Sequence, residues 1–174
     1  MTADGRRGQM SKAVLISIRP EWCEKIGSGE KTIEVRKTLP ALPVPFKCYI
    51  YETQGKTETP WMDEDGHWDF RGRGKIIGEF ICDEIVPVDV PYPAYMHEVN
   101  PEVLDASCLS YWDLHQYGGS GKMLYGWHIS DLVIYDEPKP LTDFYKWWDD
   151  DIDSTEYPYL KIQRAPRSWC YAWG

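Results

Sequence analysis

The stretch Gly29-Glu30-Lys31-Thr32-Ile33-Glu34-Val35-Arg36-Lys37 follows a short helix pattern, Pro20 to Ser28, and predicts a β-strand. Side chains alternate between the two faces of a strand. One face therefore takes the apolar pair and two lysines: Lys31, Ile33, Val35 and Lys37. The opposite face takes a hydroxyl, a carboxylate and a guanidinium: Thr32, Glu34 and Arg36. Such a row of polar groups can line a binding cleft, although a solvated face of an antiparallel strand is the plainer interpretation.

Length and composition predict one globular domain. The chain has 174 residues, with 9 Trp and 12 Tyr against only 4 Phe, and both enriched types suit stacking surfaces as well as cores. No apolar run approaches the roughly 18 residues of a membrane helix, and the first residues lack a signal-peptide pattern. We therefore predict a disordered tail over 1–11, a domain over 12–174 and a cytoplasmic location.

The cysteine spacing argues against a bound metal, and the net charge argues against non-specific binding to nucleic acid. The five cysteines show no Cys-x-x-Cys pair and no clustered Cys/His spacing, so we predict reduced, buried thiols, no metal and no cofactor. The net charge of −9 argues against a protein coated for non-specific nucleic-acid binding. Residues 1–37 nevertheless hold eight Lys or Arg against five Asp or Glu. A local basic patch fits a small ligand or a confined nucleic-acid contact.

Strand patterns outnumber helix patterns along the chain. Strands are predicted at 14–18, 29–37, 47–52, 75–86 and 124–135, and helices at 20–28 and 101–116. The closing segment 164–173 ends in a strand-like alternation. Proline breaks 39–45 and 87–93 into extended links, and 53–73 is predicted as an inserted loop or hairpin. Gly78 indicates a bulge or a close approach, and we expect a bend near Ser130 and Asp131 in the strand over 124–135. This order favours an α+β domain built around a small β-barrel.

Five pieces of the sequence together resemble the ASCH domains of the PUA-like superfamily, over roughly Lys12 to Trp173. They are Leu15-Ile16-Ser17-Ile18-Arg19-Pro20, the opening stretch 29–37, Lys75-Ile76-Ile77-Gly78-Glu79-Phe80, Trp127-His128-Ile129-Ser130 and Pro166-Arg167-Ser168-Trp169-Cys170-Tyr171. The resemblance implies a PUA-like barrel of five to six strands with flanking helices.

The resemblance also implies two classes of function. PUA-like domains generally bind RNA or modified bases, and some ASCH members are ribonucleases on single-stranded RNA. A small branch hydrolyses N4-acylated cytidine with a Lys and, three residues later, a nucleophilic Thr. Lys31 matches that Lys, but Glu34 stands where the Thr would be, and Thr32 is displaced by two residues. Our first hypothesis is therefore a domain that binds RNA or a modified nucleotide, and the alternative is a hydrolase using the same cleft.

The candidate site residues follow from their chemistry. A carboxylate accepts from a cytosine amino group, an arginine binds phosphate, and aromatic rings stack on bases. The predicted ligand or RNA contacts are Lys31, Thr32, Glu34, Arg36, Lys37, Trp127, His128, Trp169 and Tyr171. If the protein is an enzyme, the predicted catalytic residues are Lys31, Glu34 and Glu79.

Each candidate has a structural alternative. Glu34 and Arg36 can simply pair with each other, Thr32 suits a strand, and a lone histidine such as His128 is more often structural. The predicted partners are single-stranded RNA or a modified nucleoside, with no membrane and no metal. The acidic segment 143–156 is a further candidate surface for a protein partner.

Overall fold

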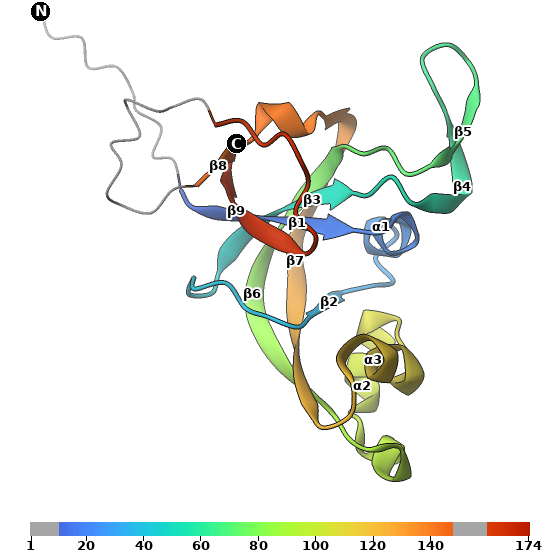
Figure 1. Ribbon diagram of the computed structural model, residues 1–174, viewed down its shortest axis with the longest axis vertical. Coiled ribbons are helices and arrows are strands. Elements are labelled where there is room, and N and C mark those ends of the chain that lie inside the picture. The colour runs from blue at the N-terminus through green and yellow to red at the C-terminus, as the bar shows by residue number, and fades with distance from the viewer. Residues whose placement is uncertain (1–10, 148–159) are drawn as a thin grey trace, which may run out of the picture.

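The computed structural model of the protein describes residues 11–147 and 160–174 (Figure 1). Nearly all of the predicted tail 1–11, and the acidic segment 143–156 from residue 148 onward, lie outside the described residues. The strands are β1 (Ala13–Ile18), β2 (Ile33–Arg36), β3 (Phe46–Glu52), β4 (Lys56–Met62), β5 (Trp68–Arg71), β6 (Ile76–Val90), β7 (Lys122–Lys139), β8 (Tyr145–Lys146) and β9 (Trp169–Trp173). The helices are α1 (Pro20–Gly27), α2 (Pro101–Ser107), α3 (Tyr111–Gly118) and the 3₁₀ turns η1 (Pro93–Glu98) and η2 (Leu141–Asp143).

Seven strands form one mixed sheet in the order β2-β7-β6-β3-β1-β9-β8. β1 and β3 pair in parallel, and the other neighbours pair antiparallel. Figure 1 shows β6 and β7 running together as a long curved ribbon, with α2 and α3 beside the end of that ribbon nearest β2. The prediction of an α+β domain is confirmed.

The sheet is not closed into the predicted barrel of five to six strands. Strand pairing in the described chain starts at β2 and ends at the two-residue strand β8 without returning from one edge to the other. The chain after β2 holds Pro40, Pro43 and Pro45, which lack N–H donors, so β2 is not prolonged into a ladder with β1 or β9. A side chain of β2 contacts β1 in place of a strand ladder: Arg36 Nη2 donates to Ser17 O at 2.8 Å.

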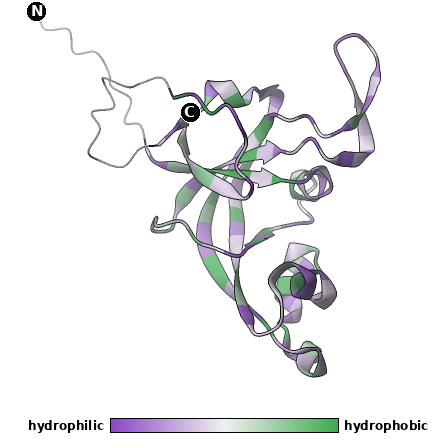
Figure 2. Cartoon of the chain, in the orientation of Figure 1, coloured by the Kyte–Doolittle hydropathy of each residue, from purple (hydrophilic) through white to green (hydrophobic). Residues whose placement is uncertain are grey.

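The two faces of the curved sheet bury separate apolar clusters. All six residues of β1 are buried, as expected for a central strand apolar on both faces. Val14 and Ile16 pack with Phe80 and Trp127 on one face, while Leu15 packs on the other. Figure 2 shows the corresponding alternation of hydrophobic and hydrophilic bands along β6 and β7. The strand period of two therefore places the core on both sides of β1.

A third cluster holds the helical layer against β2. Ile33 and Val35 pack with valines of β6 and with Val103 of α2 and Leu114 of α3. The helix predicted over 101–116 is interrupted between α2 and α3, because Cys108 takes a left-handed conformation with φ of 54°. Ser110 then begins α3 with a capping box to Asp113. The prediction of one helical section is corrected to two short helices.

The long strands depart from their predicted bounds. β6 runs through Pro87 to Val90, so the link predicted at 87–93 is strand over its first half. β3 pairs with β6 only as far as Cys82, and Pro87 lies beyond that point, where a missing N–H is tolerated. Within the paired region, a Cβ on Gly78 would collide with the carbonyl oxygen of Val133, which is the close approach expected there. Asp131 has φ of 47°, at the bend expected in β7.

The insertion 53–73 contains the antiparallel pair β4 and β5, which projects away from the main sheet beside α1 (Figure 1). All five cysteines are free thiols. None of the helices in the described part of the chain is long and apolar enough to span a bilayer.

Candidate functional site

Three charged side chains of the opening stretch meet inside the protein, and we call them the β2 cluster: Lys31, Glu34 and Arg36. Glu34 lies between the two cations, with Oε2 3.4 Å from Lys31 Nζ and Oε1 2.9 Å from Arg36 Nη2. The three residues are only 2%, 6% and 7% exposed in chain order. This burial separates them from an ordinary surface ion pair.

Lys31 reaches this cluster because it precedes the strand. Alternation from residue 29 onward predicted that Lys31 would share a face with Ile33 and Val35. The strand begins only at Ile33, and the Lys31 backbone N–H instead donates to Lys25 O at 2.9 Å near the end of α1. The alternation of side chains along the strand therefore does not apply to Lys31, and its side chain points to Glu34.

The walls of the β2 cluster come from distant parts of the chain. Arg36 donates from Nη2 to Ser17 O at 2.8 Å and from Nη1 to Ser168 Oγ at 3.4 Å. Lys31 Nζ donates to Ser107 O at 2.7 Å and lies 5.2 Å from the centre of the Trp22 ring. Strand β1, helices α1 and α2 and the segment before β9 thus converge on β2.

The cluster is electropositive and poorly solvated. Burial lowers the pKa of the Lys31 ammonium, and the neighbouring Glu34 carboxylate opposes this. With both cations protonated, one carboxylate faces two positive charges. Tyr117 of α3 lies within electrostatic range of Arg36 and Glu34, and burial raises the pKa of its hydroxyl. The phenol therefore stays protonated near neutral pH and can donate a hydrogen bond.

Two buried donors at this site have no hydrogen-bond partner among the described residues. They are Nε of Arg36 and Nε1 of Trp127. Trp127 is fully buried and stands opposite Glu34 in the pairing of β7 with β2, so the two side chains lie on the same face of the sheet. Buried N–H groups are rarely left unpaired, and an acceptor oxygen between these residues would satisfy them.

The other predicted ligand residues lie around the cluster with varied exposure. Thr32 is exposed, and its backbone ties β2 to its neighbours by bonds to Ala106 O and from Ile129 N. Lys37 is exposed, with Nζ 4.7 Å from the centre of the Tyr117 ring. Along the chain, Thr32 therefore lies between Lys31 and Glu34, and Lys37 directly follows Arg36.

The aromatic candidates of the C-terminal motif are half-buried. The indole N–H of Trp169 donates to Thr38 Oγ1 at 3.0 Å, and the Trp169 ring centre lies 6.1 Å from that of Trp127. The Tyr171 hydroxyl accepts from the backbone N–H of Ala41 at 2.6 Å. Both residues thus fasten the proline-rich segment that follows β2 to β9.

Glu79 and His128 are not brought to the β2 cluster. Glu79 pairs with Lys47 at 2.8 Å and accepts from the Tyr135 hydroxyl, in a strand where Phe80 points into the core. His128 Nδ1 lies 2.7 Å from Asp83 Oδ1, at an exposed pair of side chains. No group of three His, Cys, Asp or Glu side chains that could hold a metal ion occurs among the described residues.

Several residues of the site were not predicted from the sequence. Trp22, Ser107 and Tyr117 carry no local pattern that separates them from ordinary helix residues. Ser168 lies inside the C-terminal motif, but nothing in the sequence predicts its contact with Arg36. These contacts depend on segments up to 132 positions apart in the chain.

Comparison with known proteins shows the class of fold. No family model matches the chain, and no curated protein matches it. The crystal structure of ASCH from Zymomonas mobilis matches with a TM-score of 0.58 and 19% identity, over 91% of this chain and 86% of that one. Crystal structures of two mutants of the same protein also match at a TM-score of 0.58. One has 19% identity over 92% of this chain and 90% of that one, and the other 18% over 91% and 87%. The chain therefore has the ASCH fold, as its sequence motifs predicted.

Proposed function

We propose that this protein is an ASCH-domain protein that binds single-stranded RNA or a modified nucleoside at the β2 cluster. The two unpartnered N–H groups, Arg36 Nε and Trp127 Nε1, carry the proposal. Arg36 belongs to the buried ion cluster on Glu34, and Trp127 stands opposite Glu34 in the strand pairing, so the site offers donors and positive charge to an acceptor oxygen. Base carbonyl and phosphate oxygens supply such acceptors.

The charge of the protein favours a short contact with one or a few nucleotides over a long contact along a nucleic-acid backbone. The protein as a whole is acidic, with a net charge of −9, so extended binding along a nucleic-acid backbone is disfavoured. Thr32, between Lys31 and Glu34, and Lys37, directly after Arg36, are exposed and offer a hydroxyl and a cation to a ligand. The proposal includes the predicted cytoplasmic location, with which five free thiols are compatible.

Binding can be tested by fluorescence anisotropy with labelled single-stranded RNA oligonucleotides and with modified nucleosides as competitors. We expect saturable binding at micromolar protein, with modest dependence on salt. Lys31→Ala should weaken it, whereas Lys25→Ala, an exposed lysine on α1, should not. Absence of binding by every oligonucleotide and nucleoside in the panel at micromolar protein would contradict the proposal.

A hydrolase is the second candidate, and the buried Lys31 favours it. A lysine whose pKa is lowered by burial, and which lies 3.4 Å from a carboxylate, has the elements of an acid–base pair. We therefore assign the catalytic roles of that alternative to Lys31 and Glu34; Glu79 is engaged elsewhere with Lys47.

Turnover distinguishes the two candidates. Wild type and Lys31→Ala should be incubated separately with single-stranded RNA and with N4-acetylcytidine. Product formed by the wild type and lost in the variant supports a hydrolase. Equal activity in both proteins excludes the proposed mechanism, and no product with intact binding supports a domain that only binds.

A further inference from the structure

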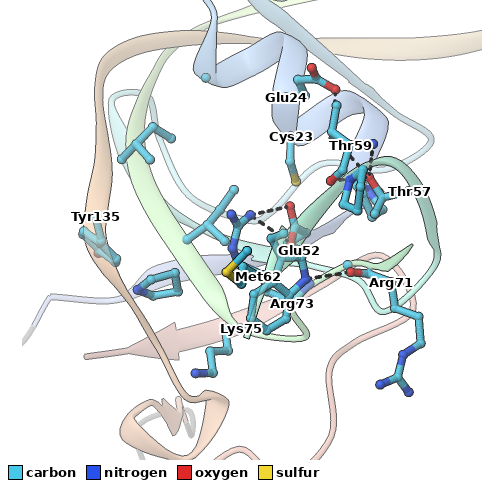
Figure 3. A pocket seen from close by; sticks show the side chains of 18 of the residues that line it. Cys23, Glu24, Glu52, Thr57, Thr59, Met62, Arg71, Arg73, Lys75 and Tyr135 are labelled. Carbon is cyan, nitrogen blue, oxygen red and sulfur yellow. Dashed lines mark hydrogen bonds and ion pairs between the residues drawn. The ribbon is translucent and has the colours of Figure 1, made fainter. Parts of the chain in front are cut away.

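A pocket of about 620 Å³ lies between α1, the β4–β5 hairpin and the adjoining ends of β3, β6 and β7 (Figure 3). None of the three β2-cluster residues lines it. Cys23 of α1 connects the two regions, because it lines the pocket and its thiol is within electrostatic range of Glu34 and Arg36. The pocket is thus a separate cavity that adjoins the β2 cluster through α1.

A buried carboxylate lies in the wall of the pocket. Glu52, at the end of β3, is only 5% exposed. Its Oε2 accepts from the backbone N–H of Arg73 at 2.6 Å, whereas the one partner of its Oε1 among the described residues is Arg73 Nη1 at a long 3.5 Å. Figure 3 shows Glu52 beside Arg73, with Cys23 of α1 on one side. A buried carboxylate oxygen with so weak a partner can accept one more N–H group.

An aromatic ring lines the same pocket, and Arg73 lies near both this ring and the Glu52 carboxylate. Trp61 of β4 is half-buried, and its indole N–H donates to Arg71 O at 2.9 Å, which fixes the ring across the hairpin. The Arg73 guanidinium lies 5.7 Å from the ring centre. Tyr135 of β7 lines the pocket as well. A flat ligand can therefore stack on a ring whose orientation is already set.

The rim of the pocket carries both signs of charge. Lys75 and Arg71 contribute cations, and Glu24, Glu64 and Asp136 contribute carboxylates. Arg71 is paired with Asp69 at 3.1 Å, whereas Lys75 is exposed at the rim. This mixture suits one small ligand with a single anionic group better than a polyanion.

We propose that the pocket binds a nucleotide through a base that carries an amino group, namely adenine, cytosine or guanine. The base stacks on Trp61, its amino group donates to Glu52 Oε1, and Lys75 contacts the phosphate. A carboxylate favours such bases because their amino groups donate, whereas uracil offers no amino group. The inference does not depend on the function proposed for the β2 cluster.

The test uses the 5′-monophosphates of the four ribonucleosides, titrated into ¹⁵N-labelled protein while the indole N–H signals are recorded. We expect AMP, CMP or GMP to shift the Trp61 signal with saturation, and UMP to bind more weakly. Trp61→Ala lacks that indole signal, so its affinity and that of the wild type are compared by isothermal titration calorimetry; the variant should bind about tenfold or more weakly, since base stacking on an aromatic ring is lost. Trp68→Ala is the matched control, because Trp68 is on the same hairpin, is 59% exposed and does not line the pocket.

The carboxylate is tested in the same way. Glu52→Gln should remove the preference for amino-bearing bases, and Glu58→Gln, an exposed carboxylate of β4, should preserve it. If Glu52→Gln does not fold, the comparison of Trp61→Ala with Trp68→Ala still shows whether the nucleotide binds in this pocket. Equal affinity for UMP, or equal affinity in wild type and Trp61→Ala, overturns the inference.

Two further measurements show whether the bound base belongs to an RNA strand or to a free nucleotide. They also separate this inference from the RNA-binding proposal for the β2 cluster. If the RNA oligonucleotide competes with the mononucleotide for the Trp61 signal, the base belongs to a strand; if it does not, the ligand is a free nucleotide. RNA binding that is weakened by Lys31→Ala while no mononucleotide binds overturns this inference alone. Mononucleotide binding at Trp61, with no binding of any RNA oligonucleotide or modified nucleoside in the panel, overturns the β2-cluster proposal alone.

Discussion

Arg36 Nη2 lies 2.9 Å from Glu34 Oε1, and both side chains are more than nine-tenths shielded from solvent. The two residues are neighbours on one face of a four-residue strand, and Lys31 approaches the same carboxylate from the turn before it. Glu34 is therefore the shared anion of two buried cations. Its removal should affect stability as well as binding.

The first prediction concerns Glu34→Gln. The neutral amide keeps the shape but leaves Lys31 and Arg36 as buried cations without a counter-charge. Removing one partner of a buried ion pair costs about 3–5 kcal/mol, so the free energy of unfolding should fall by that order. Urea denaturation followed by circular dichroism measures it. Glu30→Gln, which removes an exposed partner of Lys25, should leave the midpoint almost unchanged, and equal effects of the two changes would contradict the prediction.

The second prediction concerns Arg36→Lys. Lysine keeps the positive charge but cannot bond to Glu34, Ser17 and Ser168 at once, and it lacks the unpartnered Nε. We expect RNA or nucleoside affinity at the β2 cluster to fall by about tenfold, the size of one charge-assisted hydrogen bond. Anisotropy titration measures this. Arg19→Lys, at an exposed arginine, is the control, and full affinity in Arg36→Lys would show that the guanidinium does not contact the ligand.

The third prediction compares two glycines. In Gly78→Ala the new methyl group would collide with the Val133 carbonyl oxygen across the β6–β7 ladder, so we expect a loss of about 1–3 kcal/mol in unfolding free energy. Gly27→Ala adds the same methyl group at the end of α1, where no atom lies within 4 Å. Alanine is the better helix former, so Gly27→Ala should be neutral or stabilising. Thermal unfolding of both variants tests the contrast, which equal losses would refute.

The fourth prediction concerns pH and Glu79. Burial raises the pKa of its carboxyl, but the bonds from Lys47 and Tyr135 outweigh this and leave the pKa below the ordinary value of 4.5. Since the unfolded chain then binds more protons, Glu79 stabilises the fold above pH 4.5, and this contribution is lost as the pH falls through the lowered pKa. The stability difference between wild type and Glu79→Gln should therefore shrink as the pH is lowered from 6 toward 3. Glu137→Gln, at an exposed position of β7, is the control, and a difference independent of pH would contradict the assignment.

The sequence by itself determined the elements with strong periodicity. The apolar run of β1 predicted a central strand, Pro20 with Gly27 and Gly29 bounded α1, and Gly78 indicated a close approach in β6. These signals are local, because strand alternation, proline geometry and glycine freedom act within a few residues. The motifs in 29–37 and 166–171 also predicted the ASCH fold, although not the open edge of its sheet.

Only the tertiary structure decided which charged groups meet. Strand alternation placed Lys31 on the apolar side of β2, but the strand starts two residues later and Lys31 joins Glu34 and Arg36. The partners Ser17, Ser107 and Ser168 come from 19, 76 and 132 positions away, and Glu52 enters its pocket through the folding of the 53–73 insertion against α1. Such contacts depend on how the sheet curves and how the helices pack against it. A pattern of neighbouring residues carries no information about them, which is why the sequence predicted the strand but not the burial of its charges.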